Sequence, residues 1–147
     1  MINTSASGLT AERMRMDVIA DNIANVNTTE TENGTPYRRK TVVFQERKAT
    51  EFRVPMDMSK EMSSSEEPST GGGVRVTGIE EDQSPFKYLY DPGHPNANAQ
   101  GYVAMPNVNI VSEMTDMITA TRAYEANVTV INSAKGMATA ALNIGKS

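Results

Sequence analysis

The chain has 147 residues, with 14 Lys and Arg against 18 Asp and Glu, and it contains one His, no Cys and no Trp. This length fits one compact domain or one elongated subunit. The absence of cysteine excludes a disulfide framework, a thiolate nucleophile and a Cys-ligated zinc site, and one histidine cannot supply a multi-His metal centre. We therefore expect neither a metal nor another cofactor.

The composition is poor in residues that build a core. Val, Ile, Leu and Phe together number 26 of 147, with only 3 Leu, which is below the roughly 20% at which a folded core becomes doubtful. The net charge of −4 is too small for a disordered polyelectrolyte. Contacts other than those of a self-contained core must therefore stabilise the folded chain. Its scattered basic residues also disfavour nucleic acid as a partner.

The sequence shows no segment that would direct it into or across a membrane by the common routes. No apolar run approaches the ~20 residues of a membrane span. Residues 1–10 lack the basic and apolar regions of a cleaved secretory signal. We expect a cytoplasmic protein or one exported by a route that uses no such signal.

Residues 1–30 predict a helix with an a/d heptad seam. Its apolar positions, seven or three residues apart, are Ile2, Leu9, Met16, Ile19, Ile23 and Val26. Ser5 and Glu12 weaken the start of the seam. Asn22, Asn25 and Asn27 are expected to close the helix, because Asn tolerates the left-handed conformation and its side chain bonds nearby backbone.

Residues 31–106 predict a small β-rich portion, because all 7 prolines and 7 of the 10 glycines fall there and interrupt helices. Three runs rich in β-branched or aromatic residues predict strands of one small sheet at 40–44, 73–79 and 86–90. The segment 59–73 reads SKEMSSSEEPSTGGG and predicts a flexible loop. Arg38, Arg39 and Lys40 stand beside the first strand, where basic residues commonly protect a sheet edge.

Asp91 and His94 are the one pair that invites a catalytic interpretation, with Asp91 orienting a His base. The intervening Pro92-Gly93 is typical of a type II turn, and Pro95 forces His94 into an extended conformation. No nucleophile motif, phosphate-binding loop or metal-ligand spacing accompanies the pair. We therefore interpret this segment as a rigid corner and expect no catalytic residues.

Residues 107–147 predict a second helix with a longer heptad pattern. Its apolar positions are Ile110, Met114, Met117, Ile118, Tyr124, Val128, Ile131, Ala138 and Leu142. Thr121 and Lys135 interrupt the pattern. Pro106 precedes the helix, and Asn107 or Asn109 is placed to cap it. The pattern covers about 38 residues, or on the order of 55 Å of helix, so the helix should project from any compact body.

The chain is therefore expected to be α+β, with two terminal helices in a coiled-coil-like bundle and a small β-rich middle. An antiparallel hairpin with no other neighbours is the simplest arrangement. The seams bury little apolar area, however, which scarcely offsets roughly 1–2 kcal/mol of backbone entropy per ordered residue. We expect further partners to cover these helices, and the termini to be largely unfolded in the free monomer.

Three ordered blocks carry a family resemblance. They are SASGLTAERMRMDVIADNIANVNTT at 5–29, PYRRKTVVF at 36–44, and a block at 90–137 that begins YDPGHPNANAQGYVAMPN, followed by a closing ALNIGK. The first resembles the N-terminal signature of bacterial flagellar axial proteins of the rod and hook group. The others are similar to the proximal rod subfamily, of the FlgC type. The resemblance covers nearly the whole chain apart from about residues 47–72.

The resemblance implies a structural subunit and not an enzyme. It implies that residues 1–30 and 107–147 form the inner core of the rod, with residues 31–106 outside. It also implies export by the flagellar type III apparatus without cleavage, and a place in the periplasmic part of the basal body. The implied partners are copies of the chain, other rod subunits and components at the membrane-ring junction, with no small-molecule substrate.

Two sets of residues follow as candidates. For helix packing within and between subunits we expect Leu9, Met16, Ile19, Ile23, Val26, Ile110, Met114, Met117, Ile118, Tyr124, Val128, Ile131 and Leu142. For the turns and junctions that set the angles between the helices and the outer portion we expect Asn22, Asn25, Asn27, Pro92, Gly93, Pro95, Pro106 and Asn107.

Three other functions remain open. A distal rod or hook-type subunit is the alternative within the family, although such subunits usually have a longer middle than residues 31–106. A cytoplasmic helical adaptor or export chaperone fits the heptads and the acidic balance. A small hydrolase would use His94 and Asp91, and substitution of His94 would then abolish an activity without affecting motility.

Overall fold

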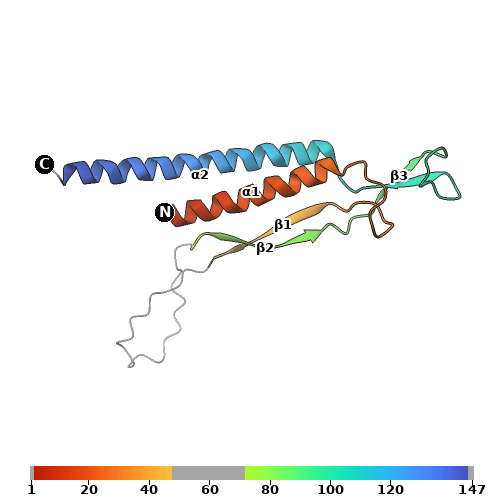
Figure 1. Ribbon diagram of the computed structural model, residues 1–147, viewed down its shortest axis with the longest axis horizontal. Helices are drawn as coiled ribbons and strands as arrows, with labels where there is room; N and C mark the ends of the chain where they lie inside the picture. The colour runs from red at the N-terminus through yellow and green to blue at the C-terminus, as the bar shows by residue number, and fades with distance from the viewer. Residues whose placement is uncertain (1, 48–71, 146–147) are drawn as a thin grey trace, which may run out of the picture.

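The structure, a computed structural model, describes residues 2–47 and 72–145. Two long helices lie side by side and antiparallel, and a smaller portion of paired strands joins them (Figure 1). The α+β class predicted from the sequence is confirmed. The predicted loop at 59–73 falls almost entirely outside the described residues.

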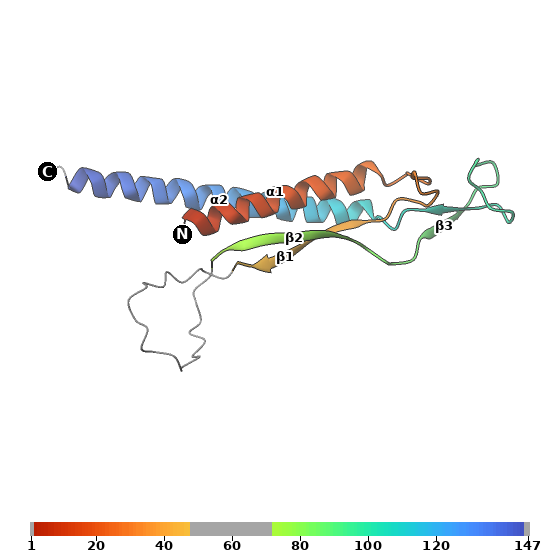
Figure 2. The same cartoon turned by 60° about the horizontal axis from the view of Figure 1, so that its bottom comes forward.

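Helix α1 spans Ile2–Ala24 and helix α2 spans Ile110–Ile144. At 1.5 Å per residue, their 23 and 35 residues correspond to about 35 and 52 Å. The C-terminal part of α2 therefore extends past the beginning of α1, as both views show (Figures 1 and 2). Asn109 caps α2, because its side chain accepts a hydrogen bond from the amide of Val111.

The strands form two separate two-stranded antiparallel sheets. Strand β1 (Lys40–Glu46) pairs with β2 (Val74–Glu81), with a register shift between Val43 and Phe44. Strand β3 (Lys87–Tyr90) pairs with β4 (Tyr102–Met105). The prediction of one sheet is wrong, and β4 was not predicted. β3 pairs with a strand close in sequence, since closing a short loop costs little entropy.

The two sheets occupy different places along the molecule. The β1–β2 ribbon lies along α1, whereas β3 lies beyond the end of the helix pair, far from the C-terminus of α2 (Figures 1 and 2). The buried apolar residues are correspondingly few and divided among these elements. They are Ala11, Val18, Ile19, Tyr37, Val103, Val108 and Ala120.

Candidate assembly interface

Asn22 joins the three elements that meet at the end of α1. Its Nδ2 donates to the carbonyl oxygen of Lys40 at 2.8 Å and to Oε2 of Glu113 at 3.0 Å. Its Oδ1 accepts from the hydroxyl of Tyr37 at 3.0 Å and from the amide of Lys40 at 2.9 Å. The side chain is fully buried and uses its whole hydrogen-bonding capacity. Asn22 thus ties α1 to β1 and to α2.

The predicted role of Asn22 as a helix terminator is wrong, because α1 continues through Ala24 and the side chain points into the interior. Asn25 does close the helix: its side chain donates to the carbonyl of Asp21 at 3.0 Å. The Asn25 carbonyl then accepts from the amide of Thr28 at 3.0 Å. Asn27 follows in the turn and is exposed.

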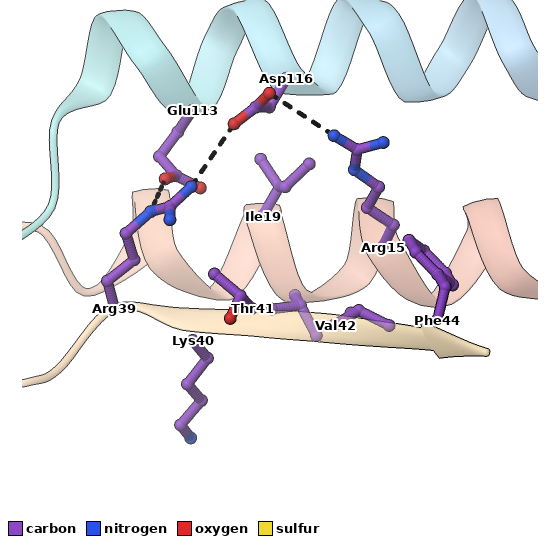
Figure 3. Close-up of a pocket in the computed structure, with 10 residues that line it drawn as sticks. Arg15, Ile19, Arg39, Lys40, Thr41, Val42, Phe44, Glu113 and Asp116 are labelled. Atoms are coloured by element: carbon purple, nitrogen blue, oxygen red, sulfur yellow. Dashed lines mark hydrogen bonds and ion pairs between the residues drawn. The ribbon is translucent and has the colours of Figure 1, made fainter. Parts of the chain in front are cut away.

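Glu113, in the first turn of α2, is the second buried polar residue of this junction and is 0% exposed. Nε of Arg39 donates to its Oε1 at 2.5 Å. Arg39 also reaches Asp116 at 3.4 Å, and Arg15 of α1 reaches the other oxygen of Asp116 at 3.6 Å. Figure 3 shows this chain of alternating charges beside a cavity of about 280 Å³. The arginines are therefore paired within the chain.

The basic triplet at 38–40 was expected to protect a sheet edge, and that prediction is wrong. Arg39 turns inward to the acidic residues of α2. Arg38 lies over the ring of Phe86, 4.4 Å from its centroid, and donates to the carbonyl of Asp82 at 3.2 Å. Lys40 lies 5.5 Å from the centroid of the Tyr37 ring. The sequence shows the charges but not the partners of Arg38 and Arg39, which lie on distant segments.

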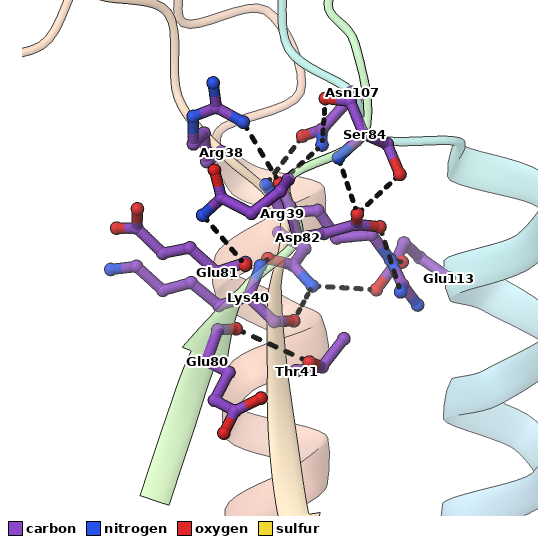
Figure 4. Close-up of polar contacts among 12 residues, drawn as sticks. Arg38, Arg39, Lys40, Thr41, Glu80, Glu81, Asp82, Ser84, Asn107 and Glu113 are labelled. Atoms are coloured by element: carbon purple, nitrogen blue, oxygen red, sulfur yellow. Dashed lines mark hydrogen bonds and ion pairs between the residues drawn. The ribbon is translucent and has the colours of Figure 1, made fainter.

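Asn107 connects the strands to the approach of α2 (Figure 4). Its Oδ1 accepts from the amide of Arg39 at 2.8 Å, and its Nδ2 donates to the carbonyls of Asp82 at 3.0 Å and Ser84 at 3.3 Å. The adjacent Pro106 is fully buried. Of the two asparagines considered as caps, Asn109 caps the helix and Asn107 holds the junction together.

Two titratable groups at the junction have shifted pKa values. Burial, together with the negative charges of Asp21, Glu113 and Glu81, raises the pKa of Tyr37 above its ordinary value. Hydrogen bonds from Ser84 and the neighbouring arginines lower the pKa of Asp82. In both cases the structure favours the form present at neutral pH: a protonated phenol that donates to Asn22 and an ionised carboxylate beside Arg39.

Close approaches of small residues set how the elements lie against α1. A Cβ added at Gly8 would lie 3.0 Å from Nδ2 of Asn127 on α2. Gly73 has a φ of +99°, and a Cβ there would lie 2.3 Å from Oγ of Ser7. The same Ser7 oxygen accepts from the amide of Val74 at 3.1 Å. Sequence reasoning missed the close contacts of Gly8, Gly73 and Ser7. Gly8 could have been found, because a glycine inside a helical pattern is a signal of close packing.

The residues predicted for helix packing fall into two groups. One group is buried or partly buried within the chain: Leu9, Met16, Ile19, Ile23, Val26, Met117, Tyr124, Val128 and Ile131. The other group is exposed on α2: Ile110, Met114, Ile118 and Leu142, with exposed fractions of 41 to 68%. The predicted heptad residues are thus divided between contacts made inside the chain and an apolar surface that the described residues leave uncovered.

The C-terminal end of α2 is exposed throughout its length. Residues 135–145 are all exposed, and Lys135 is the one charged residue among them. Met137 is 60% exposed and Leu142 is 68% exposed. A helix with so little polar surface is normally enclosed by other protein, so this segment, which we call the helix tip (residues 135–145), is a candidate interface.

The corner at 91–95 uses its polar groups to hold its own backbone. The carboxylate of Asp91 accepts from the amide of Gly93 at 3.1 Å, and Nδ1 of His94 accepts from the amide of Asn96 at 3.1 Å. The prediction of a type II turn is wrong, because Gly101 (φ +82°), and not Gly93, takes a positive φ in this loop. Pro92 and Pro95 lie in the same exposed turns. The rigid-corner interpretation explains the contacts of both candidate catalytic residues.

Two other kinds of site were sought in the described parts of the chain. Residues 2–47 and 72–145 contain no group of three or more His, Cys, Asp or Glu side chains arranged to hold a metal ion. None of the helices in those ranges is long and apolar enough to cross a membrane.

Comparison with known proteins identifies relatives over nearly the whole chain. The family described as "Flagella basal body rod protein" matches residues 2–30, and the family "Flagellar basal body rod FlgEFG protein C-terminal" matches residues 99–144. The flagellar basal-body rod protein FlgC of Borreliella burgdorferi is 49% identical over 147 residues, covering 97% of this chain and 94% of the relative. The FlgC proteins of Bacillus subtilis and Escherichia coli O6:H1 are 48% and 38% identical, each covering 99% of this chain and 96% of the relative.

Proposed function

The chain belongs to the FlgC family of flagellar basal-body rod proteins, and we propose that it assembles through its two terminal helices into the proximal rod. The observation that carries this proposal is the exposed apolar surface of α2, above all the helix tip. A subunit that functions alone gains nothing from an uncovered apolar helix. In a rod, neighbouring subunits supply the missing contacts.

In this assembly, residues 1–30 and 107–147 form the inner core and residues 31–106 lie outside it. The antiparallel pairing of α1 with α2 supports this division, because the two helices lie side by side and can enter the core of the rod together (Figure 1). Ile110, Met114, Ile118 and Leu142 make contacts between subunits, and the partly buried residues of the predicted set make contacts within the subunit. Heterologous contacts, in which one face meets a different face of the next subunit, allow open assembly of this kind.

The junction around Asn22 and Glu113 has a mechanical role in this proposal. Torque applied to the outer portion must reach the helices without bending the connection. The hydrogen bonds of Asn22 and Asn107 and the ion pairs of Arg39 link β1 to both helices. These contacts make the connection stiff.

The partners of the assembled chain are copies of itself, other rod subunits and components at the membrane-ring junction. The chain reaches them through the flagellar type III export apparatus, uncleaved, and takes its place in the periplasmic part of the envelope. The lack of cysteine suits a chain that is threaded unfolded across a membrane. Mass spectrometry of the chain from purified basal bodies should find the intact N-terminal segment.

The decisive experiment is fractionation of cells that carry or lack this gene. We expect the chain in purified basal bodies, with loss of motility and of complete rods in the deletion strain, and recovery on complementation. A purely soluble cytosolic pool would contradict the rod and favour a helical adaptor or export chaperone. A map of the basal body would then place the helices relative to the axis of the rod.

Order that depends on assembly can be measured by hydrogen exchange. The termini were expected to be unfolded in the free monomer, and the buried contacts of Asn22 and Glu113 narrow this expectation to the helix tip. Amides of residues 135–145 should exchange rapidly in a dilute monomer and slowly in purified rods. Strong protection of the tip in a demonstrably monomeric sample would contradict the proposal.

A further inference from the structure

An apolar groove of about 480 Å³ lies at the junction end of the molecule. Its walls come from β3, from the start of α2 and from the turn after α1, and they include Leu89, Ile110 and Val26. Leu89 is 56% exposed and Ile110 is 41% exposed. The one charged residue that lines the groove is Lys87, whose Nζ donates to the carbonyl of Val108 at 3.1 Å. The groove is therefore apolar apart from this single cation.

The groove opens onto a longer apolar strip on α2. From Ile110 the apolar surface continues along α2 to Met114 and Ile118, which are 52 and 55% exposed. Residues four apart share one face of a helix, so these three make a strip about 12 Å long at 1.5 Å per residue. A strip of this form suits an apolar helix better than a small molecule.

The chain itself shows what such a helix looks like. The helix tip (residues 135–145) has three alanines, at 138, 140 and 141, together with Met137 and Leu142, and a single charge. The tip lies at one end of the long axis, and β3, which lines the groove, lies toward the other end (Figures 1 and 2). Subunits that stack along this axis would bring the tip of one toward the groove of the next.

We propose that the groove lined by Leu89, Ile110 and Val26 receives the apolar C-terminal helix end of the next rod-family subunit along the axis. This inference rests on the proposed function and adds the contact through which successive subunits stack. The matched C-terminal family segment, residues 99–144, includes most of the tip. The occupant is a helix end with the composition of this tip, which is apolar and carries one charge. Two different surfaces meet in this contact, as an open assembly requires.

Site-specific photo-crosslinking in assembled basal bodies tests the contact. A benzophenone amino acid replaces Leu89 in the groove or, as the control, Ile79 on β2, which is similarly exposed at 50% and does not line the groove. Basal bodies are purified after irradiation, and the cross-linked peptides are identified by mass spectrometry. We expect the probe at Leu89 to join a peptide from the C-terminal helix of a rod-family subunit, and the probe at Ile79 not to do so.

Other outcomes overturn the inference. Cross-links from Leu89 to a ring protein, to a strand or to a different part of a rod subunit would show another occupant. No cross-link from an incorporated chain would show an empty groove. Absence of the wild-type chain from basal bodies would remove the proposed function and this inference together, whereas incorporation with cross-links elsewhere removes the inference alone.

A charge in the groove gives an independent measurement. Leu89→Glu should lower the number of complete basal bodies by about ten-fold or more, because a desolvated carboxylate costs at least the 1.4 kcal/mol that corresponds to that factor. Ile79→Glu should leave the number within about two-fold, since an exposed substitution has little effect. Circular dichroism melting curves should match the wild type for both variants. Equal numbers of basal bodies for the two variants would overturn the inference.

Discussion

The two ends of α2 differ in burial and in polarity. At the junction end, Glu113 and Asn22 are fully buried, and hydrogen bonds from three segments satisfy them. At the helix tip, every residue from 135 to 145 is exposed and nearly all are uncharged. Contacts within the chain cover the first end, whereas the second has an apolar surface that the rest of the described chain leaves exposed.

This difference separates two properties that a rod subunit needs. A buried polar network is costly when one member is lost, so the junction has one preferred geometry. An apolar surface accepts different neighbours because its contacts are not directional. Changes at the junction should therefore lower the stability of the monomer, and changes at the tip should lower assembly alone. The substitutions below test this division, from the largest expected effect on stability to the smallest.

Glu113→Ala should have the largest effect. It leaves Arg39 and Nδ2 of Asn22 without their buried acceptor, and removing one partner of a buried ion pair costs about 3–5 kcal/mol. The free energy of unfolding, from denaturant titration of the monomer, is the measurement. Glu125→Ala on an exposed position of the same helix is the control and should change it by less than about 0.5 kcal/mol. Equal effects of the two substitutions would contradict the junction's role.

Asn22→Ala should come next, with a loss of about 2–4 kcal/mol, because the hydroxyl of Tyr37 and both backbone groups of Lys40 lose a buried partner. Asn132→Ala makes the same chemical change at an exposed position of α2 and should be close to neutral. Thermal melts followed by circular dichroism compare the two. A loss below about 1 kcal/mol for Asn22→Ala would mean that other groups or water replace the amide.

Tyr37→Phe should cost about 1 kcal/mol at neutral pH, the value of one hydrogen bond, because Oδ1 of Asn22 still accepts from the amide of Lys40. Its larger effect is on the alkaline pH dependence. The folded structure raises the pKa of Tyr37 above the ordinary value of 10.0, so the unfolded chain ionises first. Stability from this group is complete below about pH 10 and falls as the pH rises through the folded pKa.

Unfolding titrations at a series of alkaline pH values measure this dependence. The wild type should lose stability more steeply above about pH 10 than Tyr37→Phe, which has no phenol to ionise at this position. Tyr88→Phe, at a residue 67% exposed, is the control and should keep the steep alkaline loss. Parallel plots of unfolding free energy against pH for wild type and Tyr37→Phe would show that ionisation of Tyr37 does not cause the alkaline loss of stability.

The sequence predicted the elements well because their signals are local. Heptads and the placement of proline and glycine predicted both helices, and β-branched runs at 40–44, 73–79 and 86–90 predicted β1, β2 and β3 to within a few residues. The four-residue β4 was missed because it is too short to show a pattern. Periodicity predicted that Ile110 and Met114 belong to one apolar seam, with Ile118 flanking it, but it says nothing about which molecule covers these residues.

Asn22 and Asn107 were among the expected junction residues, but their contacts were not predicted because the partners are distant in the chain. Asn22 lies 15, 18 and 91 positions from Tyr37, Lys40 and Glu113. An asparagine near a helix end has an adequate local explanation as a terminator, and a glutamate in a first helical turn has one as a favourable charge. Neither residue type suggests burial when read alone. Their role follows from the pairing of α1 with β1 and α2, which brings the three segments together.

Ala138→Glu should have the smallest effect on the stability of the monomer and a large effect on assembly. The residue is exposed on the helix tip, and glutamate favours helix nearly as well as alanine, so the free energy of unfolding should change by less than about 0.5 kcal/mol. In the proposed rod contact the same position is enclosed by neighbouring subunits, where an unpaired charge is costly. Ala138→Gln adds similar bulk without a charge and is the matched control. Quantification of the chain in purified basal bodies should show a strong loss for Ala138→Glu and a smaller loss for Ala138→Gln. Normal incorporation of Ala138→Glu would mean that the tip remains open to water in the rod, and the contrast between the two ends of α2 would then require another explanation.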